Sequence, residues 1–397
     1  MKKRKRIMIL GANSGQTLAI RKAVELGYYV ISADIHHDAP GHAISHEQLF
    51  IDISDREEVL RSARRIGIDG ITAYWSDMLF PVAAYVAEQM QLPHNPRHTT
   101  EIMTHKHLFR QFLSDFGFAS PRARGCSDLK EMVEFFDTLH AAAIMKPTDC
   151  SGSRGVFKVE SVEDIVLHYE ESMAYSTEGK LVIEEYLESD IIQQEAEIFV
   201  VEGKVVSWGM IEQRRDIVTS AFHPVMHLIP SDISSEIEDK VKETIQRMIT
   251  ALGYVNGPCN IEYLIGRSGE IFILDVGPRN GGNMIPQIVH AATGQDVTAM
   301  TLQAAVGDEV TISAARHKPY AMSTAVHSDS DGIFRGLTLA EGLEKRLCGS
   351  LMLKEEGTVV STFHNSRDTI GVLAFAFDSR EEMNKACEAG KIKVNIE

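Results

Sequence analysis

The chain has 397 residues and a formal net charge of −16, with 44% hydrophobic and 24% charged residues. This length exceeds one typical domain, so two or three lobes with sizeable cores are expected. Because phosphate backbones need a basic surface, the acidic balance argues against a general nucleic-acid binder. The five cysteines are scattered without metal-ligand spacing, which favours a reduced, cytoplasmic protein.

The first hundred residues are predicted to form a doubly wound parallel α/β domain. The apolar segment 7–10 is typical of a buried strand and is too short to cross a membrane. A glycine turn at 11–15 then leads into a helix over about 17–26, and a second strand at 29–33 completes a βαβ unit. The turn lacks the full G-x-G-x-x-G spacing, so we prefer a substrate-facing loop to an NAD site.

A later parallel strand is predicted at 71–75, with Ser76 and Asp77 at its carboxyl end. Ligands of open α/β sheets bind at such strand ends, so both residues are candidate substrate contacts. A helix over about 101–116 follows a proline-marked boundary, and a long helix is predicted over about 235–252.

The order of these elements predicts three parts. Residues 1–97 would form a Rossmann-like α/β domain, residues 98–317 an α+β module of short strands and glycine turns, and residues 318–397 a small α+β domain.

The most informative loop follows a strand that ends at Lys146. The small residues after it include Ser151, Gly152, Ser153 and Gly155. Successive backbone N–H groups of such a loop can bind phosphate oxygens, and the lysine adds a positive charge. It is not a Walker loop, because the lysine precedes the glycines. In isolation, an ordinary hairpin with a surface lysine is the alternative.

A second strand ends in two acids and two apolar residues: Glu184, Glu185, Tyr186 and Leu187. Backbone groups that leave a strand here can meet an adenine edge, while a carboxylate accepts from an amino group or a ribose hydroxyl. Without its neighbours, this segment would be read as an ordinary amphipathic strand end.

A third element is a predicted antiparallel hairpin that carries Glu262 on one strand and Asp275 on the other. A pair of carboxylates together with substrate phosphates suits Mg²⁺. Arg279 follows directly and is suited to bidentate contact with a phosphate or carboxylate. A half-buried hairpin with two exposed acids is the alternative.

These three elements, in this order, resemble the ATP-grasp superfamily, and the nearest likeness is to its carbamoyl-phosphate-synthase-like and biotin-carboxylase-like carboxylate–amine ligases. Lys106 resembles the second nucleotide-contacting lysine of that family. The resemblance covers nearly the whole chain. It implies an N-terminal α/β domain, an ATP-grasp α+β module and a small C-terminal block, with ATP and Mg²⁺ (or Mn²⁺) as cofactors.

The resemblance also implies roles for single residues. Lys106 and Lys146 would contact ATP phosphates, and the loop 151–155 would close over them. Glu184 would face the adenine amino group, and Glu195 resembles the acid that contacts the ribose.

Glu262 and Asp275 would hold the metal ion. The family commonly has an asparagine two positions after the second metal acid, where this chain has Gly277. Asn280, Asn283 or water would then fill that position, or the metal site would be weaker.

The resemblance implies an ADP-forming ligase of the amino-acid type, which activates a carboxylate as an acyl phosphate and joins it to an amine. Arg279 would steady the transferred group, and Arg214 and Arg215 could clamp a carboxylate. His223 and His227 are expected to be structural or loop residues rather than ligands.

Two alternatives stay open: a carboxylase-type subunit that phosphorylates bicarbonate, and an ATP-binding protein with weakened catalysis, which Gly277 motivates. The expected partners are a small-molecule carboxylate and an amine, without nucleic acid or membrane. A homodimer is the default assembly.

Overall fold

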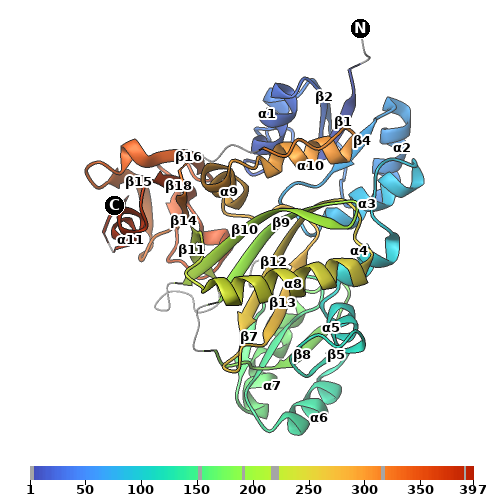
Figure 1. The fold of residues 1–397 in the computed structure, drawn as a ribbon, viewed down its shortest axis with the longest axis vertical. Helices are drawn as coiled ribbons and strands as arrows, with labels where there is room; N and C mark the ends of the chain where they lie inside the picture. Colours follow the sequence, from blue (N-terminus) through green and yellow to red (C-terminus); the bar gives the residue numbers. More distant parts are fainter. Residues whose placement is uncertain (1–3, 151–153, 190–192, 216–222, 314–317, 389) are drawn as a thin grey trace.

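The computed structural model of the chain describes residues 4–150, 154–189, 193–215, 223–313, 318–388 and 390–397. Figure 1 shows a central sheet that lies between an N-terminal α/β unit and a smaller sheet, with the C-terminal elements at one side. This arrangement confirms the expected fold class of a parallel α/β unit followed by α+β structure.

The N-terminal sheet is parallel, in the order β3-β2-β1-β4. Its strands are β1 (Arg6–Leu10), β2 (Tyr29–Ala33), β3 (Glu47–Leu49) and β4 (Gly70–Thr72), and its helices are α1 (Thr17–Glu25), α2 (Arg56–Ile66) and α3 (Phe80–Gln89). The strand predicted at 71–75 therefore ends earlier, at Thr72. Trp75 adopts a left-handed backbone with φ 62°, which no strand accommodates, so Ser76 and Asp77 lie in a loop.

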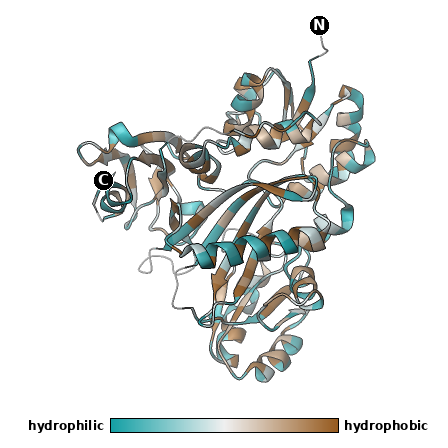
Figure 2. Ribbon diagram, in the orientation of Figure 1, coloured by the Kyte–Doolittle hydropathy of each residue, from teal (hydrophilic) through white to brown (hydrophobic). Residues whose placement is uncertain are grey.

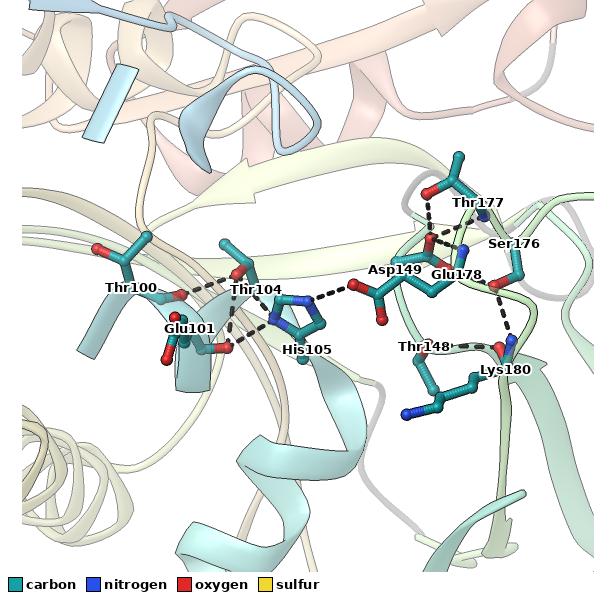
Figure 3. Close-up of polar contacts among 10 residues, drawn as sticks. All are labelled: Thr100, Glu101, Thr104, His105, Thr148, Asp149, Ser176, Thr177, Glu178 and Lys180. Atoms are coloured by element: carbon teal, nitrogen blue, oxygen red, sulfur yellow. Dashed lines mark hydrogen bonds and ion pairs between the residues drawn. The ribbon is translucent and has the colours of Figure 1, made fainter. Parts of the chain in front are cut away.

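The single helix predicted over 101–116 is wrong. Two helices, α4 (Arg97–Thr104) and α5 (Lys106–Asp115), are separated at His105, whose φ of −121° and ψ of 107° are extended. Side-chain contacts hold the break: Thr104 Oγ1 donates to Thr100 O at 2.8 Å, and His105 Nδ1 lies 2.8 Å from Glu101 O (Figure 3). The break starts a new helix at Lys106.

A four-stranded antiparallel sheet follows, in the order β5-β8-β6-β7. Its strands are β5 (Ala123–Cys126), β6 (Ala143–Pro147), β7 (Phe157–Val159) and β8 (Leu181–Glu185), with α6 (Leu129–Leu139) and α7 (Val162–Met173) packed against them. Lys146 and Glu184 therefore lie on adjacent strands.

The central sheet has eight strands in the order β13-β12-β9-β10-β11-β14-β18-β16. They are β9 (Gln194–Val201), β10 (Lys204–Arg215), β11 (Pro224–Ile229), β12 (Gly257–Ile265), β13 (Ile271–Gly277), β14 (Tyr320–Val326), β16 (Leu347–Met352) and β18 (Gly371–Phe377). Three of these strands come from the segment after residue 318, so that segment shares one sheet with the module before it.

The long helix predicted at 235–252 is confirmed as α8 (Ser235–Leu252). Its apolar side packs on one face of the central sheet, while the side visible in Figure 2 is largely hydrophilic. Strand alternation directs Ile261 and Tyr263 into this core and Glu262 to the opposite face. One face of the sheet thus packs in the hydrophobic core, and the opposite face carries polar side chains such as Glu262.

The remaining elements cover the edges. Helices α9 (Ile285–Thr293) and α10 (Val297–Ala305) pack between the central sheet and its neighbours, and a three-stranded sheet is formed by β15 (Gly332–Leu339), β17 (Val359–Val360) and β19 (Ile392–Ile396), beside α11 (Arg380–Ala386). Within the described ranges, no helix combines the length and apolar character that crossing a membrane requires.

Candidate active site

A cleft of about 1020 Å³ lies between the four-stranded sheet and the polar face of the central sheet. It brings together most of the residues singled out from the sequence: Asp77, Lys106, Lys146, Glu184, Glu185, Tyr186, Leu187, Glu195, Arg214, Arg215, Glu262, Asp275 and Arg279. Ser76 and Gly155 do not line it. Ser151, Gly152 and Ser153 lie outside the described residues.

A buried three-residue ion-pair cluster closes one end of the cleft. Lys146 Nζ donates to Glu184 Oε1 at 2.5 Å, and Arg110 Nε donates to Glu184 Oε2 at 2.8 Å. Burial opposes ionisation of Glu184, but the two cations outweigh it and lower its pKa to about 2. Both carboxylate oxygens are thus engaged, and the cluster fixes the lysine at the cleft wall.

Arg110 was not singled out from the sequence. Its guanidinium also donates to Ile273 O at 2.9 Å and Leu274 O at 2.6 Å, so it ties α5 and β8 to β13. The available signal was an arginine on the apolar side of a helical segment, three positions before the buried Leu113.

Lys106 lies between the loop that follows β6 and the second acid. Its backbone N–H donates to Thr148 O at 3.1 Å, its Nζ donates to Cys150 O at 2.8 Å, and Nζ lies 3.4 Å from Asp275 Oδ2. Burial lowers the pKa of Lys106, but Asp275 and Asp77 outweigh burial and raise it. The lysine stays charged beside the proposed phosphate loop.

A polar network holds the start of that loop (Figure 3). Asp149 accepts hydrogen bonds from Ser176 Oγ at 2.8 Å, Thr177 N at 2.8 Å, Thr177 Oγ1 at 2.5 Å and Glu178 N at 3.1 Å. Glu178 in turn lies 2.9 Å from His105 Nε2. The network therefore joins the helix break, the loop after β6 and the turn before β8.

The two predicted metal acids are cross-strand partners. Glu262 on β12 pairs with Asp275 on β13, and Glu195 on β9 pairs with Glu262 from the other side. Burial, Asp275 and Glu195 together raise the pKa of Glu262 to about 7. Gln193 Nε2 donates to Glu262 Oε2 at 2.8 Å.

This donor set fits a hard divalent cation. Among the described residues no three histidine, cysteine or acidic side chains form a ready-made metal site. Mg²⁺ commonly takes one or two carboxylates and completes its shell with water and substrate phosphates, so Glu262 and Asp275 suffice. A bound cation would also relieve the repulsion between these buried acids.

The absence of an asparagine at position 277 has a steric explanation. A Cβ on Gly277 would lie 2.9 Å from Asp77 Oδ1 and 3.0 Å from Arg279 Cζ, so a side chain would displace that ion pair. Asn280 is not a substitute ligand, because it donates to Glu197 and accepts from Thr301 in the core. Asn283 does line the cleft.

Glu195, predicted to contact a ribose, lies beside the metal acids. It accepts from Asn260 Nδ2 at 2.6 Å and Gln213 Nε2 at 3.1 Å, and His227 Nε2 lies 3.5 Å from it. Burial raises its pKa. No local sequence pattern marks Asn260 or Gln213 as partners of Glu195, because the three residues lie on different strands.

The predicted substrate contacts differ in their surroundings. Arg279 Nη2 donates to Asp77 Oδ2 at 2.8 Å, and Arg214 Nε donates to Glu212 Oε1 at 2.7 Å. Arg215 donates to Gln193 and forms no ion pair among the described residues, although the carboxylate of Glu262 attracts it electrostatically. Ser76 Oγ accepts from the backbone of Leu79 and so supports the loop before α3.

Comparison with known proteins agrees with this geometry. Residues 139–287 match the family described as ATP-grasp domain. The carbamoyl phosphate synthase large chain of Thermotoga maritima is 23% identical over 283 residues, which cover 70% of this chain and 25% of that protein. An uncharacterized protein, y4rH, of Sinorhizobium fredii is 22% identical over 285 residues, which cover 69% of this chain and 56% of that protein.

Solved structures share the fold over the whole chain. The L-amino acid ligase from Bacillus licheniformis superposes with a TM-score of 0.83 at 19% identity, covering 100% of both chains. Phosphoribosylglycinamide synthetase from Anaerococcus prevotii gives 0.79 at 20% identity, again covering 100% of both. The matched segment 139–287 thus carries an ATP-grasp domain, and the chain as a whole shares the fold of these solved structures.

Proposed function

We propose that the protein is an ADP-forming carboxylate–amine ligase of the amino-acid type. The observation that carries the proposal is the convergence of two lysines, an arginine and a carboxylate pair on one cleft: Lys106, Lys146, Arg279, Glu262 and Asp275. This combination can neutralise the charge of a transferring phosphoryl group.

The nucleotide is proposed to lie along β8 and its exit. The backbone N–H groups of Glu185 and Tyr186 already donate to Arg122 O and Ala142 O. Their carbonyl groups and the segment to Leu187 are then the natural partners for the adenine edge. Lys106 and Lys146, which both lie beside the start of the loop that follows β6, are the proposed partners of the phosphates.

The chemistry proceeds in two transfers. A substrate carboxylate oxygen bonds to the γ-phosphorus of ATP, and ADP leaves with the electron pair of the broken P–O bond. The amine then bonds to the acyl carbon, phosphate leaves, and the amine loses a proton. Arg279 donates to the phosphoryl oxygens, where negative charge develops. A divalent cation would be held by Glu262 and Asp275 and would supply further positive charge there.

The amino-acid type is supported by the fold shared with the Bacillus licheniformis L-amino acid ligase and by Arg215, a cleft arginine that forms no ion pair among the described residues. The alternative is a carboxylase-type reaction. A biotin carboxylase domain from Hydrogenobacter thermophilus, solved with MgADP and bicarbonate, also shares the fold, with a TM-score of 0.76 at 15% identity.

The test is ADP release from the purified protein with Mg-ATP and pooled carboxylates, with hydroxylamine present to trap an acyl phosphate. We expect ADP and a hydroxamate from one pool. ADP release that needs bicarbonate alone would support the carboxylase alternative. ATP binding by calorimetry without ADP from any pool would contradict a ligase and favour the non-catalytic reading.

Site variants complete this test. Lys146→Ala and Glu262→Gln should abolish ADP formation, whereas matched changes at the exposed Lys130 and Glu236 should not. Full activity in either site variant would contradict the assignment. Circular dichroism of each variant confirms that lost activity is not lost folding.

A further inference from the structure

The polar face of the central sheet continues past the metal acids. Gln213 on β10 pairs with His227 on β11, and His227 pairs with Ser323 on β14. Directly paired residues project from the same face of a sheet, so these side chains form one row. His223 precedes β11 and lines the same cleft as Gln213 and His227.

These side chains are buried, yet several of their polar atoms have no partner. The exposed fractions of Gln213, His227 and His223 are 1%, 2% and 5%. Oε1 of Gln213, Nδ1 of His227 and both ring nitrogens of His223 lack a hydrogen bond within the described chain. Buried polar groups are normally paired, so a group of exceptions along one cleft wall indicates a ligand.

The wall is polar but uncharged. Burial lowers the pKa of both His223 and His227 to about 4, with further lowering at His223 from His227 and Arg215. Each imidazole is therefore neutral near pH 7, with one N–H donor and one acceptor nitrogen. The carboxamide oxygen of Gln213 adds another acceptor.

Arg215 and several residues of the C-terminal segment line the same cleft. Arg215 lies two positions beyond Gln213 on β10, and it can hold a carboxylate. From the C-terminal segment, Ser366, Thr369, Leu353 and Val372 reach the same cleft. A ligand here would meet a cation at one end and uncharged hydrogen-bonding groups beside it.

We propose that Gln213, His223 and His227 are specificity-determining residues that recognise a hydroxyl or amide group on a carboxylate-bearing substrate, whose carboxylate Arg215 holds. The substrate class is a polar, uncharged amino acid. This inference rests on the proposed ligase function. A site built to hydrogen-bond a polar group rejects an apolar analogue, because its own buried groups would then stay unpaired.

The test compares substrates of similar shape that differ in hydrogen bonding: threonine with valine, asparagine with leucine, and glutamine with methionine. ADP release should give a kcat/KM at least about 10-fold higher for the polar member of one pair. Gln213→Met and His223→Phe should bring that ratio close to one, and His223→Phe should do so without changing the KM for ATP. His223 already lies 5.5 Å, centroid to centroid, from Phe363, so an aromatic ring suits position 223.

Matched controls are Gln111→Met and His98→Phe, at exposed positions outside the cleft, which should keep the wild-type ratio. No polar preference in the wild type, or an unchanged ratio in both site variants, would overturn the proposal.

Calorimetric binding of the same amino acids, with a non-hydrolysable ATP analogue present, tests substrate recognition separately from ligase activity. Selective binding without ADP formation would contradict the proposed ligase activity but not the proposed recognition by Gln213, His223 and His227. Equal binding of the polar and the apolar amino acid of each pair would contradict the proposed recognition even if ADP forms. Thermal melting of each variant verifies folding, and the test does not depend on replacing His227 within the sheet.

Discussion

Arg279 donates a hydrogen bond to Asp77 over 2.8 Å, although 202 positions separate the two residues in the sequence. Asp77 comes from the loop after the last strand of the N-terminal sheet, and Arg279 follows β13 of the central sheet. Gly277 leaves the space that this pair occupies. The N-terminal α/β unit therefore orients the guanidinium of Arg279 in the candidate active site.

Replacing the acid of this pair should impair catalysis more than nucleotide binding. Asp77→Asn keeps the size but removes the charge, so Arg279 would lose its fixed direction. We expect kcat/KM for the carboxylate to fall about 10-fold, the equivalent of about 1.4 kcal/mol. Gly277→Ala should act in the same way by crowding the pair. Steady-state ADP release measures both, and unchanged rates in both variants would refute the coupling; the exposed Asp38→Asn is the control.

Removing the acid of the buried cluster should destabilise the protein. Glu184→Gln leaves Lys146 and Arg110 buried without a carboxylate, which costs about 3–5 kcal/mol of unfolding free energy. Lys146→Ala should cost less, because Glu184 keeps Arg110. Denaturant unfolding at pH 7 measures the difference, and equal stability of Glu184→Gln and wild type would contradict the role of the cluster.

The same variant has a pH signature. The folded pKa of Glu184 is about 2 and its ordinary value is 4.5, so its stabilising effect is present above pH 4.5 and is lost as the pH falls towards 2. The stability gap between wild type and Glu184→Gln should therefore narrow from pH 4.5 to pH 3. A gap that is constant over this interval would argue against a charged Glu184.

The network around Asp149 should act on nucleotide affinity. Asp149→Asn removes one acceptor oxygen from the network that fixes the loop beside Lys106. We expect the KM for ATP to rise several-fold, on the order of 1 kcal/mol, with a smaller change in kcat. The exposed Asp137→Asn should leave both constants unchanged. A fall in kcat at constant KM for ATP would refute a positioning role.

The neutral histidines should make the fold sensitive to mild acid. Both have a folded pKa of about 4 against an ordinary value of 6.5, so unfolding takes up protons in this interval. The contribution of the two neutral histidines to the free energy of unfolding is fully present above pH 6.5 and declines as the pH falls towards 4. His223→Phe should lessen that decline by roughly 1–3 kcal/mol, as measured by denaturant unfolding at pH 7 and pH 4.5. The exposed His98→Phe should decline as the wild type does.

The features predicted well from the sequence are those that local patterns encode. Strand β1 and helices α1 and α8 follow apolar periodicity, and the hairpin with Glu262 and Asp275 follows strand alternation around a glycine turn. The helix break at His105 has a different origin. Its partner Glu178 and the Lys106 partner Thr148 lie far along the chain, so no local pattern marks it.

The same limit applies to the cleft. Each of its acids and lysines has a recognisable sequence context, but the pairing of Arg110 with Glu184 and of Asp77 with Arg279 arises only when separate sheets meet. The row from Gln213 to His227 was hidden for the same reason, because sheet register alone places them together.

The strand order of the central sheet also sets what can be exchanged between relatives. Because β14 pairs with β11, truncating the chain near residue 318 would remove the hydrogen-bonded neighbour of β11. The exposed strand edge would then be prone to aggregation. The connection from β16 to β18 contains β17, which pairs with β15, and it brings Leu353, Ser366 and Thr369 to the cleft. Exchanging the residues of that connection that line the cleft, with β17 retained, is therefore expected to change the substrate preference of the proposed ligase.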